Sequence, residues 1–392
     1  MKLKHLALAL AIPALAHAAP FTATLGPLKP GYTMVDLPEG NYNVTVTFGG
    51  GKAASSTTIK AELRRLMLEN VVTKPGETVK RTFTVNVRTP RIPASASIAE
   101  GVVNLKVPRE TVQEAWAWDP RLTLEVAGDS AAVKGVEIVA ADTPTIFLIG
   151  DSTVCDQPGE PYGSWGQMLP RFFKAGVAIA NHAESGETLR DSIARRRLDK
   201  MLSAMKPGDV MLIQFGHNDQ KQIREGKGGP FTTYKAELKT HVEGVLARGG
   251  IPVVISSMER RNFDAQGKVV PSLIDYATAA REVANEMKVA YIDLNAQSKL
   301  FYEALGPEGS RAAFAEPAPG KIDNTHHNSY GAYELAKIVA GALRQAKLPV
   351  AAYLADDFSG FDPTKPDAPA SFAVPRSPTY NAERPLGDET NR

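Results

Sequence analysis

Five residues of the chain could together hydrolyse an ester through a serine. Ser152 stands in "GDSTV", directly after the apolar run "TIFLIG". Its hydroxyl could attack a carbonyl, His326 could take the proton, and Asp323, three residues earlier, could fix the tautomer of that histidine. Gly186 in "ESGET" offers an unobstructed backbone N–H, and Asn218 in "GHND" offers a side-chain amide. Such donors stabilise the oxyanion that develops in acyl transfer, so these residue types favour serine ester hydrolysis.

The elements that must bring these residues together are strands of a parallel sheet. From about residue 144, unbroken apolar runs alternate with helical segments: "TIFLIG", "GVAIAN", "DVMLIQFG", "IPVVISS" and "VAYIDL". Unbroken runs are typical of strands buried on both faces, and strand–helix alternation predicts a doubly wound, flavodoxin-like sheet. Ligands bind at the carboxyl ends of such strands. The first three polar blocks directly follow predicted strands, and the fourth precedes the last predicted helix.

The first half of the chain has a different period. Between about residues 21 and 142, apolar and polar residues alternate, as at Tyr42, Val44, Val46 and Phe48, and Gly/Pro clusters separate the runs. This pattern predicts an antiparallel β-sandwich. After residue 350 the chain is rich in proline and low in periodicity, which leaves two alternatives open: a tail that wraps the surface, or a disordered one.

The amino terminus has the features of a secretory signal. A basic "MKLKH", a short apolar run and the A-x-A site Ala16-His17-Ala18 occupy the first 18 residues. We therefore expect an exported protein, periplasmic or secreted, without a membrane span, because the apolar run is shorter than the roughly 20 residues that a span needs. The predicted divisions are a signal peptide (1–18), a β-sandwich (19–142), a catalytic domain (143–349) and a Pro-rich tail (350–392).

The composition and net charge indicate a globular protein and give no reason to expect nucleic acid as a partner. The chain has 392 residues, 43% of them hydrophobic, which is enough for sizeable cores. Removing the two signal lysines from the 45 basic residues leaves 43, equal to the 43 acidic residues. A net charge near zero gives no reason to expect nucleic acid as a partner. The one cysteine excludes an internal disulfide, and the oligomeric state is left open.

The four blocks "GDST", "ESGET", "GHND" and "DNTH" together resemble those of the SGNH, or GDSL-like, hydrolases. The stretches "GSWGQMLPRFF" and "DNTHHNSYGA" are also similar to the rhamnogalacturonan acetylesterases among carbohydrate esterases, and the resemblance covers roughly residues 144 to 347. It implies Ser152 as nucleophile, His326 as base and Asp323 as its orienting group. It further implies an oxyanion hole of the Ser152 and Gly186 N–H groups and the Asn218 amide, and no cofactor.

The resemblance also bears on the first half and on the substrate. Bacterial members of the family often carry an N-terminal sandwich similar to galactose-binding domains.

Many relatives have a basic residue after the second-block glycine, where this chain has Glu187 and Thr188. The implied substrate is an acetylated plant cell-wall polysaccharide, foremost pectic rhamnogalacturonan. Two alternatives stay open: an esterase of the same mechanism acting on xylan, lipid or thioester, and an inert carbohydrate-binding protein.

A cysteine and several histidines also lie near the predicted catalytic residues. Cys155 is expected to pack as a small hydrophobe rather than act as nucleophile. No H-E-x-x-H or similar spacing predicts a metal site among His217, Asp219 and the later histidines.

Possible substrate-binding residues form a second group. Arg260 and Arg261 follow the fourth predicted strand, and arginine suits recognition of galacturonate carboxylates. His327 could line the cleft, and Trp165 could either stack on a sugar or pack beneath the serine loop.

Overall fold

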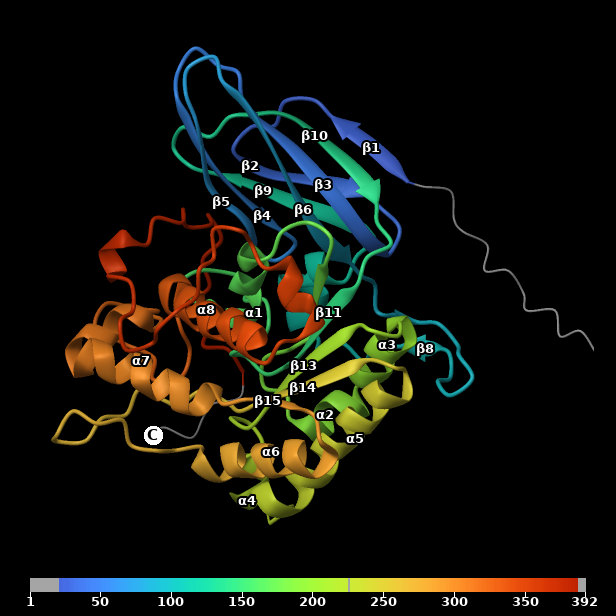
Figure 1. Ribbon diagram of the computed structural model, residues 1–392, viewed down its shortest axis with the longest axis vertical. Helices are drawn as coiled ribbons and strands as arrows, with labels where there is room; N and C mark the ends of the chain where they lie inside the picture. Colours follow the sequence, from blue (N-terminus) through green and yellow to red (C-terminus); the bar gives the residue numbers. More distant parts are fainter. Residues whose placement is uncertain (1–20, 225, 387–392) are drawn as a thin grey trace, which may run out of the picture.

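The computed structural model describes residues 21–224 and 226–386; the expected signal peptide (1–18) lies outside them. A β-sandwich stands on one side of a larger α/β unit (Figure 1). Each of its two sheets has four antiparallel strands, and the faces between them bury alternate residues such as Val44 and Val46 of β3. One sheet has the order β1 (Thr22–Leu25), β10 (Val133–Ala140), β3 (Gly40–Gly49), β6 (Thr78–Val87); the other has β2 (Gly31–Asp36), β9 (Arg121–Ala127), β4 (Ser55–Ala61), β5 (Arg65–Thr73).

The second unit is a five-stranded parallel sheet between two layers of helices, as the sequence predicts. Both faces of its strands are buried: Leu148 packs into one core, while the next residue on either side, Phe147 and Ile149, packs into the other. This explains the unbroken apolar runs, since a strand covered on both faces has no polar side. The strand order is β12 (Ala178–Asn181), β11 (Thr145–Gly150), β13 (Val210–Gln214), β14 (Ile251–Ile255), β15 (Ala290–Ile292).

Helices cover the two faces of this sheet. One core contains residues of α1 (Trp165–Met168), α7 (Leu294–Gly309) and α8 (Ser329–Gln345). The other contains residues of α2 (Leu189–Ala194), α3 (Arg197–Ala204), α5 (Lys235–Ala247) and α6 (Ile274–Met287), while α4 (Lys221–Arg224) lies beyond β13. No helix among the described residues is long and apolar enough to cross a membrane.

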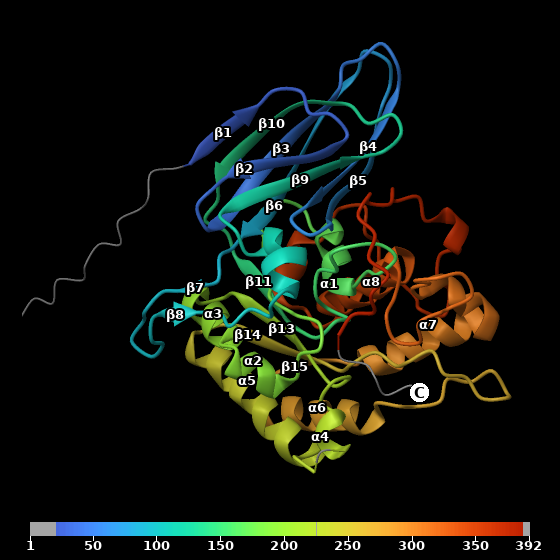
Figure 2. The ribbon, with the colours of Figure 1, turned by 180° about the vertical axis from the view of Figure 1, so that it is seen from behind.

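A long connection between β6 and β9 leaves the sandwich and packs on the α/β unit (Figure 2). It contains β7 (Arg91–Ile92), β8 (Gly101–Val102), a five-residue π-helical turn (Arg109–Gln113) and a 3₁₀ turn (Ala115–Ala117). The Asn104 N–H donates to the Arg195 carbonyl at 3.0 Å. Trp118 is buried in the core that contains α2 and α3. Residues that belong to the sandwich by sequence therefore contact the helical layer.

The Pro-rich tail returns across both units. It contains 3₁₀ turns at Pro349–Tyr353 and Pro369–Ser371, and buries Phe358 in the α/β core. Farther along, Lys60 of β4 donates to the Pro375 carbonyl at 2.7 Å and to Ser377 Oγ at 2.8 Å. Of the two alternatives for this segment, the described part up to residue 386 wraps the surface.

Candidate active site

A tight turn at the end of β11 presents Ser152. The carboxylate of Asp151 accepts the Thr153 N–H at 3.0 Å and the Thr153 hydroxyl at 2.7 Å, and its carbonyl accepts the Val154 N–H at 3.0 Å. Burial opposes ionisation of Asp151, but its contact with His217 (3.5 Å) and these hydrogen bonds outweigh burial and lower its pKa. Asp151 thus holds the turn in which Ser152 follows the strand.

The structure brings Ser152, His326 and Asp323 into one chain of hydrogen bonds. Ser152 Oγ lies 2.9 Å from His326 Nε2, and His326 Nδ1 lies 3.1 Å from Asp323 Oδ2. The other oxygen of Asp323 accepts the N–H groups of Thr325 (2.8 Å) and His326 (2.9 Å). This is the connectivity of a serine hydrolase triad, in which a carboxylate orients the histidine and the histidine contacts the hydroxyl.

The loop that carries the acid and the histidine is anchored at both ends. The Asp323 N–H donates to the Ala315 carbonyl at 2.8 Å, and the Ala315 N–H donates to the His326 carbonyl at 3.0 Å. Asn328 then caps α8 by accepting the Gly331 N–H. This anchoring holds the three-residue spacing in a loop rather than in a helix.

Two further predicted residues lie on the neighbouring loops. Gly186 follows β12 with a φ of +75°, a left-handed conformation that favours glycine. Asn218 follows β13, is almost completely buried, and donates from Nδ2 to the Glu187 carbonyl at 3.1 Å. One of its two amide hydrogens therefore supports the Gly186 loop. The second hydrogen of the amide can donate to an oxyanion.

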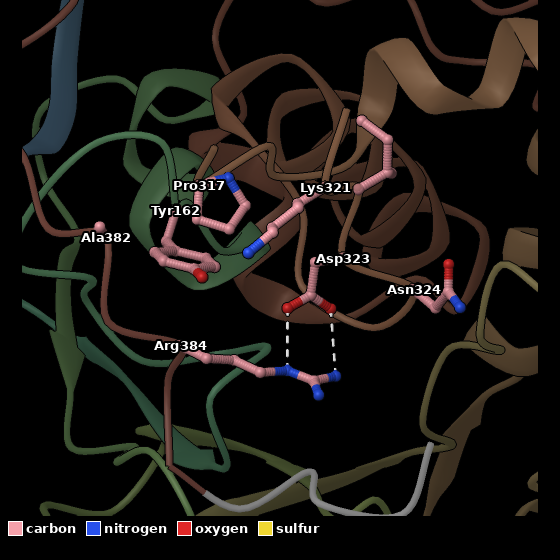
Figure 3. A pocket seen from close by; sticks show the side chains of 8 residues that line it. Tyr162, Pro317, Lys321, Asp323, Asn324, Ala382 and Arg384 are labelled. Atoms are coloured by element: carbon pink, nitrogen blue, oxygen red, sulfur yellow. Dashed lines mark hydrogen bonds and ion pairs between the residues drawn. The ribbon is translucent and has the colours of Figure 1, made fainter. Parts of the chain in front are cut away.

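The pocket beside the triad contains a residue that sequence reasoning missed. Arg384 of the tail pairs with both oxygens of Asp323, with Nε 3.0 Å from Oδ2 and Nη2 3.4 Å from Oδ1 (Figure 3). A cavity of about 230 Å³ lies here, lined in part by Tyr162, Lys321 and Ala382. Burial alone would raise the pKa of Asp323, but His326 and Arg384 hold it well below its usual value. The carboxylate therefore stays ionised.

The tail continues from Arg384 across the loop of Gly186. A Cβ placed on Gly186 would lie 3.1 Å from the Cβ of Leu386. Earlier in the tail, the Tyr380 hydroxyl donates to the Pro317 carbonyl at 2.6 Å. Ser152 is only 2% exposed in this arrangement. No periodicity or motif in the Pro-rich sequence indicates these contacts.

Two of the predicted substrate contacts are packing residues instead. Trp165 is fully buried and donates from Nε1 to Gln214 Oε1 at 2.7 Å, so the sugar-stacking alternative is excluded by burial and the packing alternative holds. His327 does not line the cleft, because its Nε2 lies 2.8 Å from the Tyr302 hydroxyl and its ring stacks on that tyrosine. Burial lowers the pKa of His327 to about 3, so it stays neutral.

The two arginines after β14 are not among the residues that line the pocket beside Asp323. Arg260 is 2% exposed and donates from Nη1 to Ser272 Oγ at 3.3 Å, so burial excludes direct contact with a polymer and the prediction for this residue is wrong. Arg261 is partly exposed and donates from Nη1 to the Pro307 carbonyl at 3.0 Å. Their place after a strand brings their backbone to the sheet edge, but these two side-chain hydrogen bonds go to residues outside the pocket lining.

Cys155 is buried, and its Sγ lies 3.4 Å from Ser185 Oγ. Burial, with Glu184 and Glu114 nearby, raises the pKa of the thiol well above its usual value. A protonated thiol is a poor nucleophile, and the hydroxyl in contact with His326 is that of Ser152. The site therefore favours serine chemistry.

This chain is similar to several known proteins. Residues 148–332 match the GDSL-like Lipase/Acylhydrolase family. Rhamnogalacturonan acetylesterase RhgT of Bacillus subtilis is 38% identical over 219 residues, which are 53% of this chain and 93% of that protein. The probable rhamnogalacturonan acetylesterase YesY of the same organism is 32% identical, over 52% and 94% of the two chains. The crystal structure of protein YxiM from Bacillus subtilis covers 81% of this chain and 80% of its own, at 24% identity and a TM-score of 0.49.

Proposed function

Because the chain belongs to the GDSL-like Lipase/Acylhydrolase family, we propose that it is a carbohydrate acetylesterase in which Ser152 is the nucleophile. Membership of this family makes it a carboxylic ester hydrolase. The single observation that carries the assignment of the nucleophile is the 2.9 Å contact between Ser152 Oγ and His326 Nε2. Asp323, at 3.1 Å from the other ring nitrogen, orients the histidine.

The reaction proceeds in two steps through an acetyl-enzyme. Ser152 Oγ attacks the acetyl carbonyl while its proton passes to His326 Nε2, and the negative oxygen is stabilised by the N–H groups of Ser152 and Gly186 and by the Asn218 amide. His326 then gives the proton to the departing sugar hydroxyl. In the second step His326 activates water, which attacks the acetyl carbonyl and releases acetate and free Ser152.

We propose pectic rhamnogalacturonan as the substrate polymer. The names of the relatives RhgT and YesY support this choice. So does the cationic side of the pocket, where the exposed residues Lys321 and Arg384 flank Asp323 (Figure 3). Galacturonate residues carry carboxylates, and cations in this pocket beside Asp323 would attract them. This assigns to Lys321 and Arg384 the role that the sequence suggested for Arg260 and Arg261.

Acetate release from acetylated pectin, xylan and chitin fragments tests the proposal. Ser152→Ala should lose activity on every substrate, and retention of full activity would refute the nucleophile. Lys321→Met should raise KM more on acetylated pectic fragments than on p-nitrophenyl acetate, because only the former are anionic. Lys29→Met removes an exposed lysine of the sandwich and is the matched control. The choice of polymer would be refuted if Lys321→Met and Lys29→Met changed KM on acetylated pectic fragments equally. Faster acetate release from xylan than from pectin by the wild-type protein would also refute it.

Two further proposals concern the rest of the chain. The similarity of the sandwich to galactose-binding domains stays a prediction, which retention on immobilised galactan would test. Export is proposed from the basic start, apolar run and A-x-A site in the first 18 residues. Cell fractionation, with sequencing of the mature amino terminus, would detect cleavage after Ala18.

A further inference from the structure

The loop that carries Gly186 is held by basic side chains from the N-terminal half of the chain. We call residues 184–187 the oxyanion loop and residues 106–114, between β8 and β9, the bracing segment. Arg109 donates from Nε to Glu184 Oε1 at 2.9 Å and from Nη2 to Ser185 Oγ at 2.8 Å. One guanidinium thus joins two successive residues directly before Gly186.

Lys106 contacts the residues directly before and directly after Gly186. Its Nζ donates to the Ser185 carbonyl and lies 2.9 Å from Glu187 Oε1. Glu187 is completely buried, and the Lys106 side chain is 13% exposed. Each side chain of the oxyanion loop that can hydrogen-bond therefore has a partner in the bracing segment, and Gly186 lies between the two anchored positions.

These contacts belong to a buried network of acidic and basic side chains. Carboxylate oxygens of Glu110, Glu114 and Glu184 lie within 4.8 Å of one another. Arg109 contacts Glu114 at 2.7 Å, and Arg197 pairs with Glu110. Removing one partner from such a network leaves an uncompensated buried charge, so the remaining groups would move toward water or other partners.

Glu187 shows how the network is balanced. Burial raises the pKa of its carboxyl, and Arg197 and Lys106 oppose that rise. Arg197 Nε is 3.8 Å away and Arg195 Nε 3.3 Å away, both farther than the ammonium of Lys106. Lys106 is therefore the cation in closest contact with this carboxylate.

The oxyanion loop also positions the second donor. The Glu187 carbonyl accepts Asn218 Nδ2 at 3.1 Å. A shift of the peptide between Ser185 and Glu187 would therefore displace the Gly186 N–H and the Asn218 amide together. Both donors are thus coupled to Lys106 and Arg109.

We propose that Lys106 and Arg109 are positioning residues for the esterase reaction, which fix the oxyanion hole from the N-terminal half of the chain. The inference rests on the proposed function of Ser152, Gly186 and Asn218. A misplacement of about 1 Å can cost 100-fold in rate, and complete loss of one donor costs about 100- to 1000-fold. Loss of Lys106 should therefore lower kcat by roughly 10- to 100-fold and leave KM within about threefold, because no substrate contact is removed.

Kinetics of the full-length protein on p-nitrophenyl acetate test this, with Lys106→Met as the variant. Lys200→Met is the matched control, since Lys200 is also buried and also joins the two halves, by donating to Glu39 and to the Arg91 carbonyl. The control should lose thermal stability but keep kcat. Arg109→Lys keeps the buried charge but not the two-pronged contact, and it should also lower kcat.

Coupling to the oxyanion hole separates positioning from general destabilisation. In an Asn218→Ala background, Lys106→Met should cost much less than it costs in the wild-type protein, because one of the donors it positions is already gone. Fully additive losses, or an equal loss of kcat in Lys200→Met, would overturn the inference. If Lys106→Met is not recovered folded, an unchanged kcat in Arg109→Lys overturns it. If Asn218→Ala loses most of its kcat while Lys106→Met keeps the wild-type kcat, the positioning role of the bracing segment is refuted and the proposed function stands. If the wild-type protein has no esterase activity, the proposed function itself is refuted.

Discussion

The Asn218 amide is the donor whose removal most directly tests the proposed oxyanion hole. Asn218→Ala deletes a side chain that is 1% exposed and donates to the Glu187 carbonyl at 3.1 Å. Loss of one oxyanion donor removes about 2.7–4 kcal/mol of transition-state stabilisation, or roughly 100- to 1000-fold in kcat. KM should change little, since the oxygen becomes negative only after attack.

The same substitution has a separate cost in stability. The Glu187 carbonyl loses a donor in a buried position, which costs about 1–3 kcal/mol. For a unit of about 200 residues this corresponds to a fall in Tm of roughly 2–4 °C per kcal/mol. The variant should therefore remain folded at assay temperature, and its kinetic defect should be far larger than its loss of stability would suggest.

A second buried asparagine separates the two effects. Asn295 donates from Nδ2 to the Ser257 carbonyl at 2.9 Å and to Glu259 Oε1 at 3.0 Å, and it is 5% exposed. Asn295→Ala should lower Tm comparably and leave kcat near the wild-type value. Both variants would be measured by acetate release and by thermal denaturation. A loss of kcat below threefold in Asn218→Ala, or an equal loss in both variants, would refute the assignment of the amide as an oxyanion donor.

Two further predictions concern buried groups. Cys155→Ala should keep kcat within about threefold, and iodoacetamide should not label the native thiol at pH 8, because burial raises its pKa; rapid labelling with inactivation would contradict this. Burial lowers the pKa of His241 to about 4, so the unfolded chain takes up a proton below pH 6.5 that the folded chain does not. Stability is therefore lost as pH falls, by about 2 kcal/mol at pH 5 from this residue. Between pH 7 and pH 5, urea unfolding should show a smaller fall in the free energy of unfolding for His241→Gln than for the wild-type protein. An equal fall in the two proteins would refute this prediction.

The α/β unit could be predicted from the sequence because each of its strands is covered on both faces. Phe147 and Leu148 pack into opposite cores, so residues 146–149 are all apolar. An apolar run of this kind predicts a buried strand from the sequence alone. The strand ends then place the polar blocks, since parallel strands have their carboxyl ends at one edge. Ser152 and His326 meet there at 2.9 Å although 174 residues separate them in the chain.

Side-chain direction could not be predicted in the same way. Arg260 follows β14, and its backbone position suggested the cleft, yet its guanidinium contacts Ser272 and is buried. Arg384 stands in an aperiodic, Pro-rich tail and nevertheless reaches Asp323. A strand pattern fixes which side of a sheet a residue faces, whereas a loop or tail has no period from which a contact 61 residues away can be inferred.

Glu187 shows why the two halves of the chain must be considered together. The sequence resemblance leads one to expect a basic residue near this position, where the chain has Glu187. In the structure Glu187 is completely buried and lies 2.9 Å from Lys106, so its charge is matched inside the protein rather than offered to a ligand. A buried acid at this position would be costly without a cation of its own. Lys106 comes from the sandwich half, and it follows that an isolated 143–392 fragment would leave Glu187 without its nearest partner and should show a lower kcat than the full chain.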